Sequence, residues 1–156
     1  MKRLLNALVR ESGISIPINR IGIGAIIVAV FLVGGSVSYG AELSPEATVS
    51  NYYDALKNGN FEQAAEYVSR TMMGDKTKKE WADAWKKTFE YAKVVILECS
   101  VSPAKIEGDK ATVKVKSMSK DKFNSQGLVE NEIDHLIKEN GVWKIDETEV
   151  LLDMPY

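Results

Sequence analysis

The sequence is poor in several features on which particular functions depend. Of its 156 residues only Cys99 is a cysteine, so an intramolecular disulfide scaffold is excluded. A formal net charge of −2 disfavours a nucleic-acid-binding domain, which is normally basic. The sequence also lacks zinc-ligand spacing, a phosphate-binding glycine loop, a nucleophile elbow and a dinucleotide fingerprint. We therefore expect no metal, no cofactor and no nucleic-acid partner.

The charged residues are distributed unevenly along the chain. Residues 21–41 carry no charge, and a run of this length can cross a bilayer as a helix. The preceding residues 1–20 hold four basic side chains against one acid, Glu11, and the positive-inside rule keeps such a flank in the cytoplasm. We predict a cytoplasmic flank at 1–20, a single transmembrane helix at 21–41, and an extracytoplasmic domain at 42–156.

Two interpretations of residues 21–41 remain open. One is a retained signal anchor. The other is a signal peptide, cleaved or left uncleaved, with Ser38-Tyr39-Gly40 as a small-residue cleavage site. The long flank and the long apolar run favour the anchor. A lipoprotein is excluded because no cysteine directly follows the apolar run.

The first half of the exported part shows helical signals. Ser44 precedes a proline and an acid, which is typical of a helix start. Asn60 with Gln63 indicates a second start, and Thr77 with Glu80 predicts a capping box that opens a third helix. Apolar residues follow these starts at helical spacing. The pattern predicts three helices.

The second half shows strand signals. Alternating or β-branched segments lie at 94–102, 112–118, 128–138 and 142–148. Asn140-Gly141 predicts a two-residue hairpin turn between the last two. Helices followed by strands indicate the α+β class, with three helices packed on a curved antiparallel sheet of about four strands.

Two segments resemble a known superfamily. The run at 44–65, from Ser44-Pro45-Glu46 to Phe61-Glu62-Gln63-Ala64-Ala65, and the closing run at 138–145 are similar to nuclear transport factor 2-like domains. The closer resemblance is to an uncharacterised bacterial exported branch, domain of unknown function 4878. It implies a cone-shaped domain with its mouth between helices and sheet. The superfamily hosts enzymes, binding proteins and assembly subunits, and its sheet-to-sheet dimers imply a homodimer as one arrangement.

His135 is the single histidine. Strand alternation places it on one face with Val129, Asn131, Ile133 and Ile137. We expect this apolar-rich face to point into the cone, where the resemblance implies that a histidine could do acid–base work. No orienting acid accompanies it in sequence, which favours a histidine that is hydrogen-bonded in the core or at the rim of the sheet. We thus predict no catalytic residue, and the candidates for a pocket lining are Tyr53, Trp85, Asn131 and His135.

Three acids, Glu130, Glu132 and Asp134, alternate with that face. Alternate positions on a strand lie too far apart to hold one cation together. Lys114 and Lys116 on the preceding strand are candidate cross-strand partners. We therefore predict that the three acids form a solvated, charged face.

Together these features favour a membrane-anchored extracytoplasmic binding or assembly module over an enzyme. Its expected partners are the membrane, and a protein or a small ligand at the sheet face or the cone mouth. Two alternatives stay open. One is a small-ligand enzyme that uses His135 in a cone pocket. The other is a scaffold subunit of an envelope secretion or conjugation complex.

Overall fold

The computed structural model describes residues 42–151, so the predicted membrane helix at 21–41 lies outside the described residues. Between residues 42 and 151, every helix is too short or too polar to span a bilayer. The described helices are α2 (Pro45–Lys57), α3 (Phe61–Ala65), α4 (Arg70–Met73) and α5 (Lys78–Ala92). The strands are β1 (Val95–Val101), β2 (Lys105–Glu107), β3 (Lys110–Lys120), β4 (Leu128–Glu139) and β5 (Val142–Leu151).

Local capping sets where the longer helices begin. The Ser44 side chain accepts a hydrogen bond from the backbone N–H of Ala47 at 3.2 Å, and the α5 capping box between Thr77 and Glu80 is complete. Both predicted starts are confirmed. The predicted start at Asn60 is confirmed as well, because α3 begins at Phe61, but the Asn60 side chain makes no capping hydrogen bond. The short helix α4 was not predicted, and it begins where the Ser69 hydroxyl accepts from the N–H of Met72 at 2.9 Å.

The sheet is antiparallel, with the strand order β1-β3-β4-β5. Its fifth strand, β2, pairs with β3 beyond the end of β1. The prediction of about four strands did not include β2, which follows Pro103. Proline has no N–H for a ladder, so β1 ends at Val101, and pairing with β3 resumes at Lys105.

The predicted turn between β4 and β5 is confirmed. Asn140 has a φ of 53° and Gly141 a φ of 80°, which are the positive values that a type I′ turn requires. The turn pairs Glu139 with Val142 and Lys138 with Trp143. This pairing fixes which residues of the two strands share a face.

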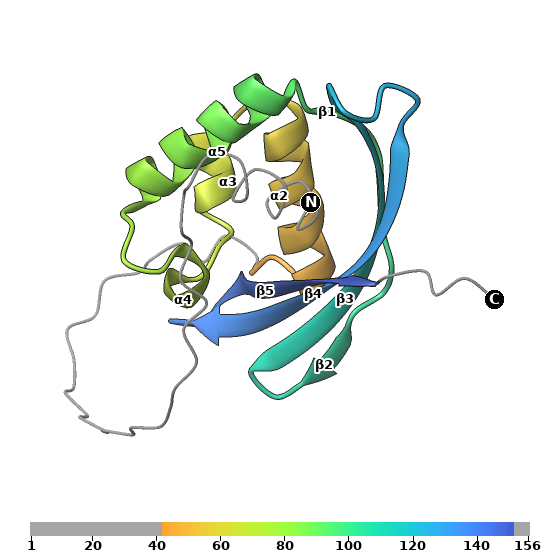
Figure 1. Ribbon diagram of the computed structural model, residues 1–156. Coiled ribbons are helices and arrows are strands. Elements are labelled where there is room, and N and C mark those ends of the chain that lie inside the picture. Colours follow the sequence, from red (N-terminus) through yellow and green to blue (C-terminus); the bar gives the residue numbers. More distant parts are fainter. Residues whose placement is uncertain (1–41, 152–156) are drawn as a thin grey trace.

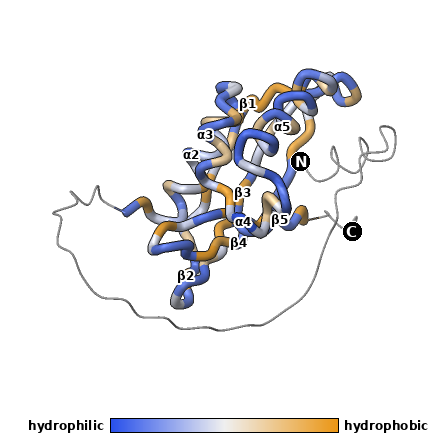
Figure 2. The backbone as a smooth tube through the Cα atoms, turned by 90° about the vertical axis from the view of Figure 1, so that its left-hand side faces the viewer, coloured by the Kyte–Doolittle hydropathy of each residue, from blue (hydrophilic) through white to orange (hydrophobic). Residues whose placement is uncertain are grey.

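The helices cover one face of a strongly bent sheet (Figure 1). The long strands β3 and β4 curve around α2, and the apolar core fills the space between the two layers. Hydrophobic positions lie along the strands, whereas the tip of the β2–β3 hairpin is hydrophilic (Figure 2). All of the described helices lie on this one side, so they leave the other face of the sheet uncovered.

The two ends of helix α2 contact the regions near opposite ends of strand β1. Near its start, a Glu46 carboxylate oxygen accepts from the N–H of Ala104, beyond the end of β1, at 2.7 Å. At its last residue, the Lys57 ammonium donates to the carbonyl of Leu97, near the start of β1, at 2.8 Å. The start of the described chain at residue 42 and the start of β1 therefore lie at opposite ends of the domain.

We expect Thr77→Ala to lower the free energy of unfolding by about 1 kcal/mol, because it removes a capping side chain. The hydroxyl accepts from the N–H of Glu80 at 3.2 Å and donates to its carboxylate at 2.8 Å. Urea unfolding followed by tryptophan fluorescence measures the change. The matched control is Thr88→Ala in the same helix, whose hydroxyl bonds only a backbone carbonyl. Equal losses in the two variants would contradict this role for the cap.

Candidate functional site

The two faces of β4 are exchanged relative to the prediction from its sequence: the side chains expected to face solvent face the helices. The three acids point toward the helices and are buried, with Glu132 at 1% exposure and Asp134 at 0%. His135 lies on the uncovered face with its side chain 40% exposed. The predictions of an inward-facing histidine and of a solvated acidic face are therefore both wrong.

The turn at Asn140-Gly141 gives the physical reason. Directly opposed residues in an antiparallel pair share a face. Trp143 and Ile145 are buried in the core, and they oppose Lys138 and Leu136. The even-numbered residues of β4 must then face inward. This evidence was present in the sequence, but the apolar residues at odd-numbered positions concealed it.

The inward acids are tied to two different elements. The Tyr53 hydroxyl of α2 donates to Glu132 Oε2 at 3.0 Å, and this bond joins the helix to the sheet. The Thr148 hydroxyl of β5 donates to Asp134 Oδ1 at 2.6 Å. Within residues 42–151, Oδ2 of Asp134 is buried without a hydrogen-bond partner. Tyr52 packs edge-on against Tyr53, with ring centroids 5.2 Å apart.

Burial dominates the electrostatics of this cluster. It raises the pKa of Asp134 to about 7; the Glu132 carboxylate adds to the rise, whereas the Thr148 bond opposes it. Burial, with the nearby acids, also raises the pKa values of Tyr52 and Tyr53, so both phenols stay neutral. The same causes raise the pKa of Cys99 to about 12, so its thiol is unreactive. Near pH 7, Asp134 can therefore hold or release a proton.

The four predicted pocket residues do not come together. Tyr53 is buried on the inner side of the sheet. Trp85 is half-buried between the rings of Trp81 and Phe89. Asn131 and His135 lie on the other side of the sheet, where the His135 imidazole is 3.6 Å from a Glu149 carboxylate oxygen. Ligand binding by these residues stays a prediction, but one pocket cannot hold all four.

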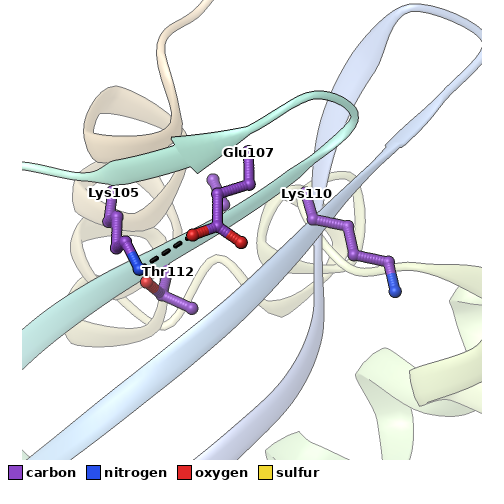
Figure 3. Close-up of a pocket in the computed structure, with 5 residues that line it drawn as sticks. Lys105, Glu107, Lys110 and Thr112 are labelled. Carbon is purple, nitrogen blue, oxygen red and sulfur yellow. Dashed lines mark ion pairs between the residues drawn. The ribbon is translucent and has the colours of Figure 1, made fainter.

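Within the described range, His, Cys, Asp and Glu side chains form no cluster of three placed to hold a metal ion. A shallow hollow of about 90 Å³ lies over the β2–β3 hairpin. Figure 3 shows its Lys105–Glu107 ion pair, 2.8 Å long, with Lys110 extending away from it. Both side chains of the pair are more than two-thirds exposed. The hollow is thus a surface feature rather than an enclosed site.

The uncovered face of the sheet carries a more extensive pattern. Its centre is a row along β4, here called the outer stripe, made up of Val129, Asn131, Ile133, His135 and Ile137. On one side of this row β3 presents Lys114 and Lys116, and on the other side β5 presents Glu147 and Glu149. A row in which three apolar residues alternate with Asn131 and His135 thus lies between a basic row and an acidic row.

The chain is similar in structure to several solved proteins. A SEC-C motif-containing protein from Rhodopseudomonas palustris is 22% identical, with 69% of this chain and 79% of that one covered and a TM-score of 0.56. A domain of unknown function with a cystatin-like fold from Nostoc punctiforme is 18% identical, with 70% and 75% covered and a TM-score of 0.55. An NTF2-like protein of unknown function from Cytophaga hutchinsonii is 17% identical, with 73% and 94% covered and a TM-score of 0.45.

The likenesses to the first two of these structures show the fold. The chain has a cystatin-like α+β fold, with helices packed on a five-stranded antiparallel sheet. Neither a protein-family model nor a curated protein matches the chain. The predicted α+β class is confirmed, while membership of the branch known as domain of unknown function 4878 stays a prediction.

We expect the domain to lose stability as the pH rises from about 5 to about 8. The pKa of Asp134 is about 7 in the folded state, above the usual value of about 3.9 in an unfolded chain. The folded state therefore binds the proton more tightly, and this stabilisation is lost as the pH rises through the folded pKa. The loss between pH 5 and pH 8 is about 3 kcal/mol, and urea unfolding at each pH measures it.

Asp134→Asn tests the assignment, because an amide keeps the shape of the side chain but does not ionise. We expect this variant to lose most of the pH dependence and to be the more stable protein at about pH 8. Asp75→Asn, at an exposed position in the loop before α5, is the matched control and should leave the slope nearly unchanged. A slope that persists in Asp134→Asn would show that another group is responsible.

Proposed function

We propose that this chain is a membrane-anchored extracytoplasmic binding or assembly module that docks through the outer stripe. The observation that carries the proposal is the uncovered sheet face, on which Val129 is 47% exposed and Ile133 and Ile137 remain partly exposed. Exposed apolar side chains rimmed by charged ones are typical of a protein-interaction surface. We do not propose the alternative of a small-ligand enzyme that uses His135, because this residue lies on the face of the sheet opposite to the helices.

The anchor is supported by the charge-free run at 21–41 and its basic flank. We expect the full chain to remain in the membrane fraction after carbonate washing. We also expect a protease added outside the cytoplasmic membrane to digest the domain at 42–151 while sparing the flank. Recovery of the intact chain in the soluble fraction, or protection of the domain, would overturn the anchoring or its orientation.

The partner that fits the outer stripe is a second copy of this chain. Ile133 opposes Lys114 on one side and Glu149 on the other. If two sheets face each other across a two-fold axis parallel to β4, then β3 of one copy lies over β5 of the other. Each basic row thereby meets an acidic row while the apolar rows meet in the middle. An axis perpendicular to the strands would instead place lysine over lysine.

Charge exchange tests this arrangement. Lys114→Glu should weaken the dimer about tenfold, because like charges then face each other across the axis. Combining it with Glu149→Lys should restore the dimer, since opposite charges meet again. Light scattering of the full chain, purified in a mild detergent, measures the mass of the complex. Lys79→Glu, on α5, is the control and should have no effect.

A monomeric parent protein would reject the second copy as the partner. An unaltered dimer in Lys114→Glu would reject the outer stripe as the interface. A larger complex containing other envelope proteins, dependent on the same side chains, would favour the scaffold alternative. The membrane experiment is separate, because it reports on residues 1–41 and not on the sheet face.

A further inference from the structure

A second surface lies where α5 ends beside the β3–β4 loop. We propose that it binds an acidic segment of a partner protein, and we call it the basic–aromatic tip. It consists of Tyr91, Lys93, Val95, Lys120, Lys122 and Phe123. It is distinct from the outer stripe, and it rests on the proposed membrane anchoring only for the choice between a protein and a lipid partner.

The tip is held in place by specific bonds. One oxygen of the Asp121 carboxylate accepts from the N–H groups of Phe123 at 2.6 Å and Asn124 at 2.8 Å, which closes the loop. The N–H of Lys122 donates to the carbonyl of Ala92 at 2.8 Å. The loop is therefore fastened to the last residue of α5, and side chains that are distant in the sequence are held side by side.

Lys122 sits between two aromatic rings. Its ammonium nitrogen lies 3.2 Å from the ring centroid of Tyr91 and 4.8 Å from that of Phe123. Both rings are nevertheless 53% exposed, and Val95 is 54% exposed. Large apolar groups that stay in water although the fold holds them in place mark a contact surface.

The charge of the tip is opposite to that of the domain. Residues 42–156 hold 16 basic and 21 acidic side chains, whereas the tip exposes Lys93, Lys120 and Lys122 together. The neighbouring acids are Glu90, which is exposed, and Asp121, which is buried and bonded within the loop. Carboxylates can pair with the lysines and approach the positive ring edges, while apolar side chains cover the ring faces.

The position of the tip favours a protein over the lipid of the anchoring membrane. The tip includes the start of β1, near the C-terminal end of α2, and residue 42 lies at the other end of that helix. A helix of 13 residues is about 20 Å long. The anchor therefore holds the lipid on one side of the domain, and the tip points away from it.

The test uses the full chain in zwitterionic detergent and a short fluorescein-labelled peptide of alternating glutamate and leucine. Fluorescence anisotropy should show binding that weakens as salt is added. Combining Lys120→Gln with Lys122→Gln should reduce the affinity about tenfold, and Phe123→Ala should reduce it severalfold. The matched control combines Lys78→Gln with Lys79→Gln, which removes two lysines from the other end of α5.

Failure of the parent protein to bind the peptide, or equal losses in the tip and control variants, would overturn the proposal. Tighter binding to single-stranded DNA or to phosphatidylglycerol vesicles than to the peptide would reject the acidic polypeptide as the partner. Far-UV circular dichroism verifies that each variant is folded. None of these substitutions touches the outer stripe or residues 1–41, so the test is independent of the proposed dimer and anchor.

Discussion

The register between β4 and β5 is the constraint on which the rest of the domain depends. Two residues with positive φ, Asn140 and Gly141, close the hairpin and bring Lys138 opposite Trp143. The burial of Trp143 then decides which side of β4 faces the helices. A shift of one residue would exchange the two faces of the strand. The acids would then lie in water and His135 in the core.

That register produces two surfaces with contrasting chemistry from one strand. Inside, Glu132 accepts from Tyr53 and Asp134 accepts from Thr148, so polar bonds link α2 and β5 to the central strand. Buried polar groups need such partners, because removing a polar group from water costs much free energy when no hydrogen bond replaces those to water. Outside, the same strand presents an apolar row between opposite charges. The inner face of β4 thus fastens the sheet to α2, and the outer face indicates which kind of surface it can bind.

The two proposed contact surfaces differ in how they are built. The outer stripe follows from strand alternation, and its charged rims follow from the pairing of β3 and β5 with β4. The basic–aromatic tip depends on the closure of a loop onto the end of a helix. Because they occupy different parts of the domain, self-association through one leaves the other open to a different partner. A tethered dimer would present two tips and bind a multivalent partner more tightly than a single copy.

The sequence alone determined the features that are set within a few residues. Ser44 and the Thr77–Glu80 pair fixed helix starts, and Asn140-Gly141 fixed a turn, because caps and turns depend on local backbone chemistry. Tertiary packing decided the facing of β4. Apolar residues at its odd-numbered positions favoured one facing, and the burial of Trp143 and Ile145, which oppose its even-numbered positions, selected the other. Tertiary structure also determined the basic–aromatic tip. The β3–β4 loop closes onto the end of α5 and brings Lys122 beside Tyr91, and these two residues are too far apart in the sequence for a local pattern to predict the contact.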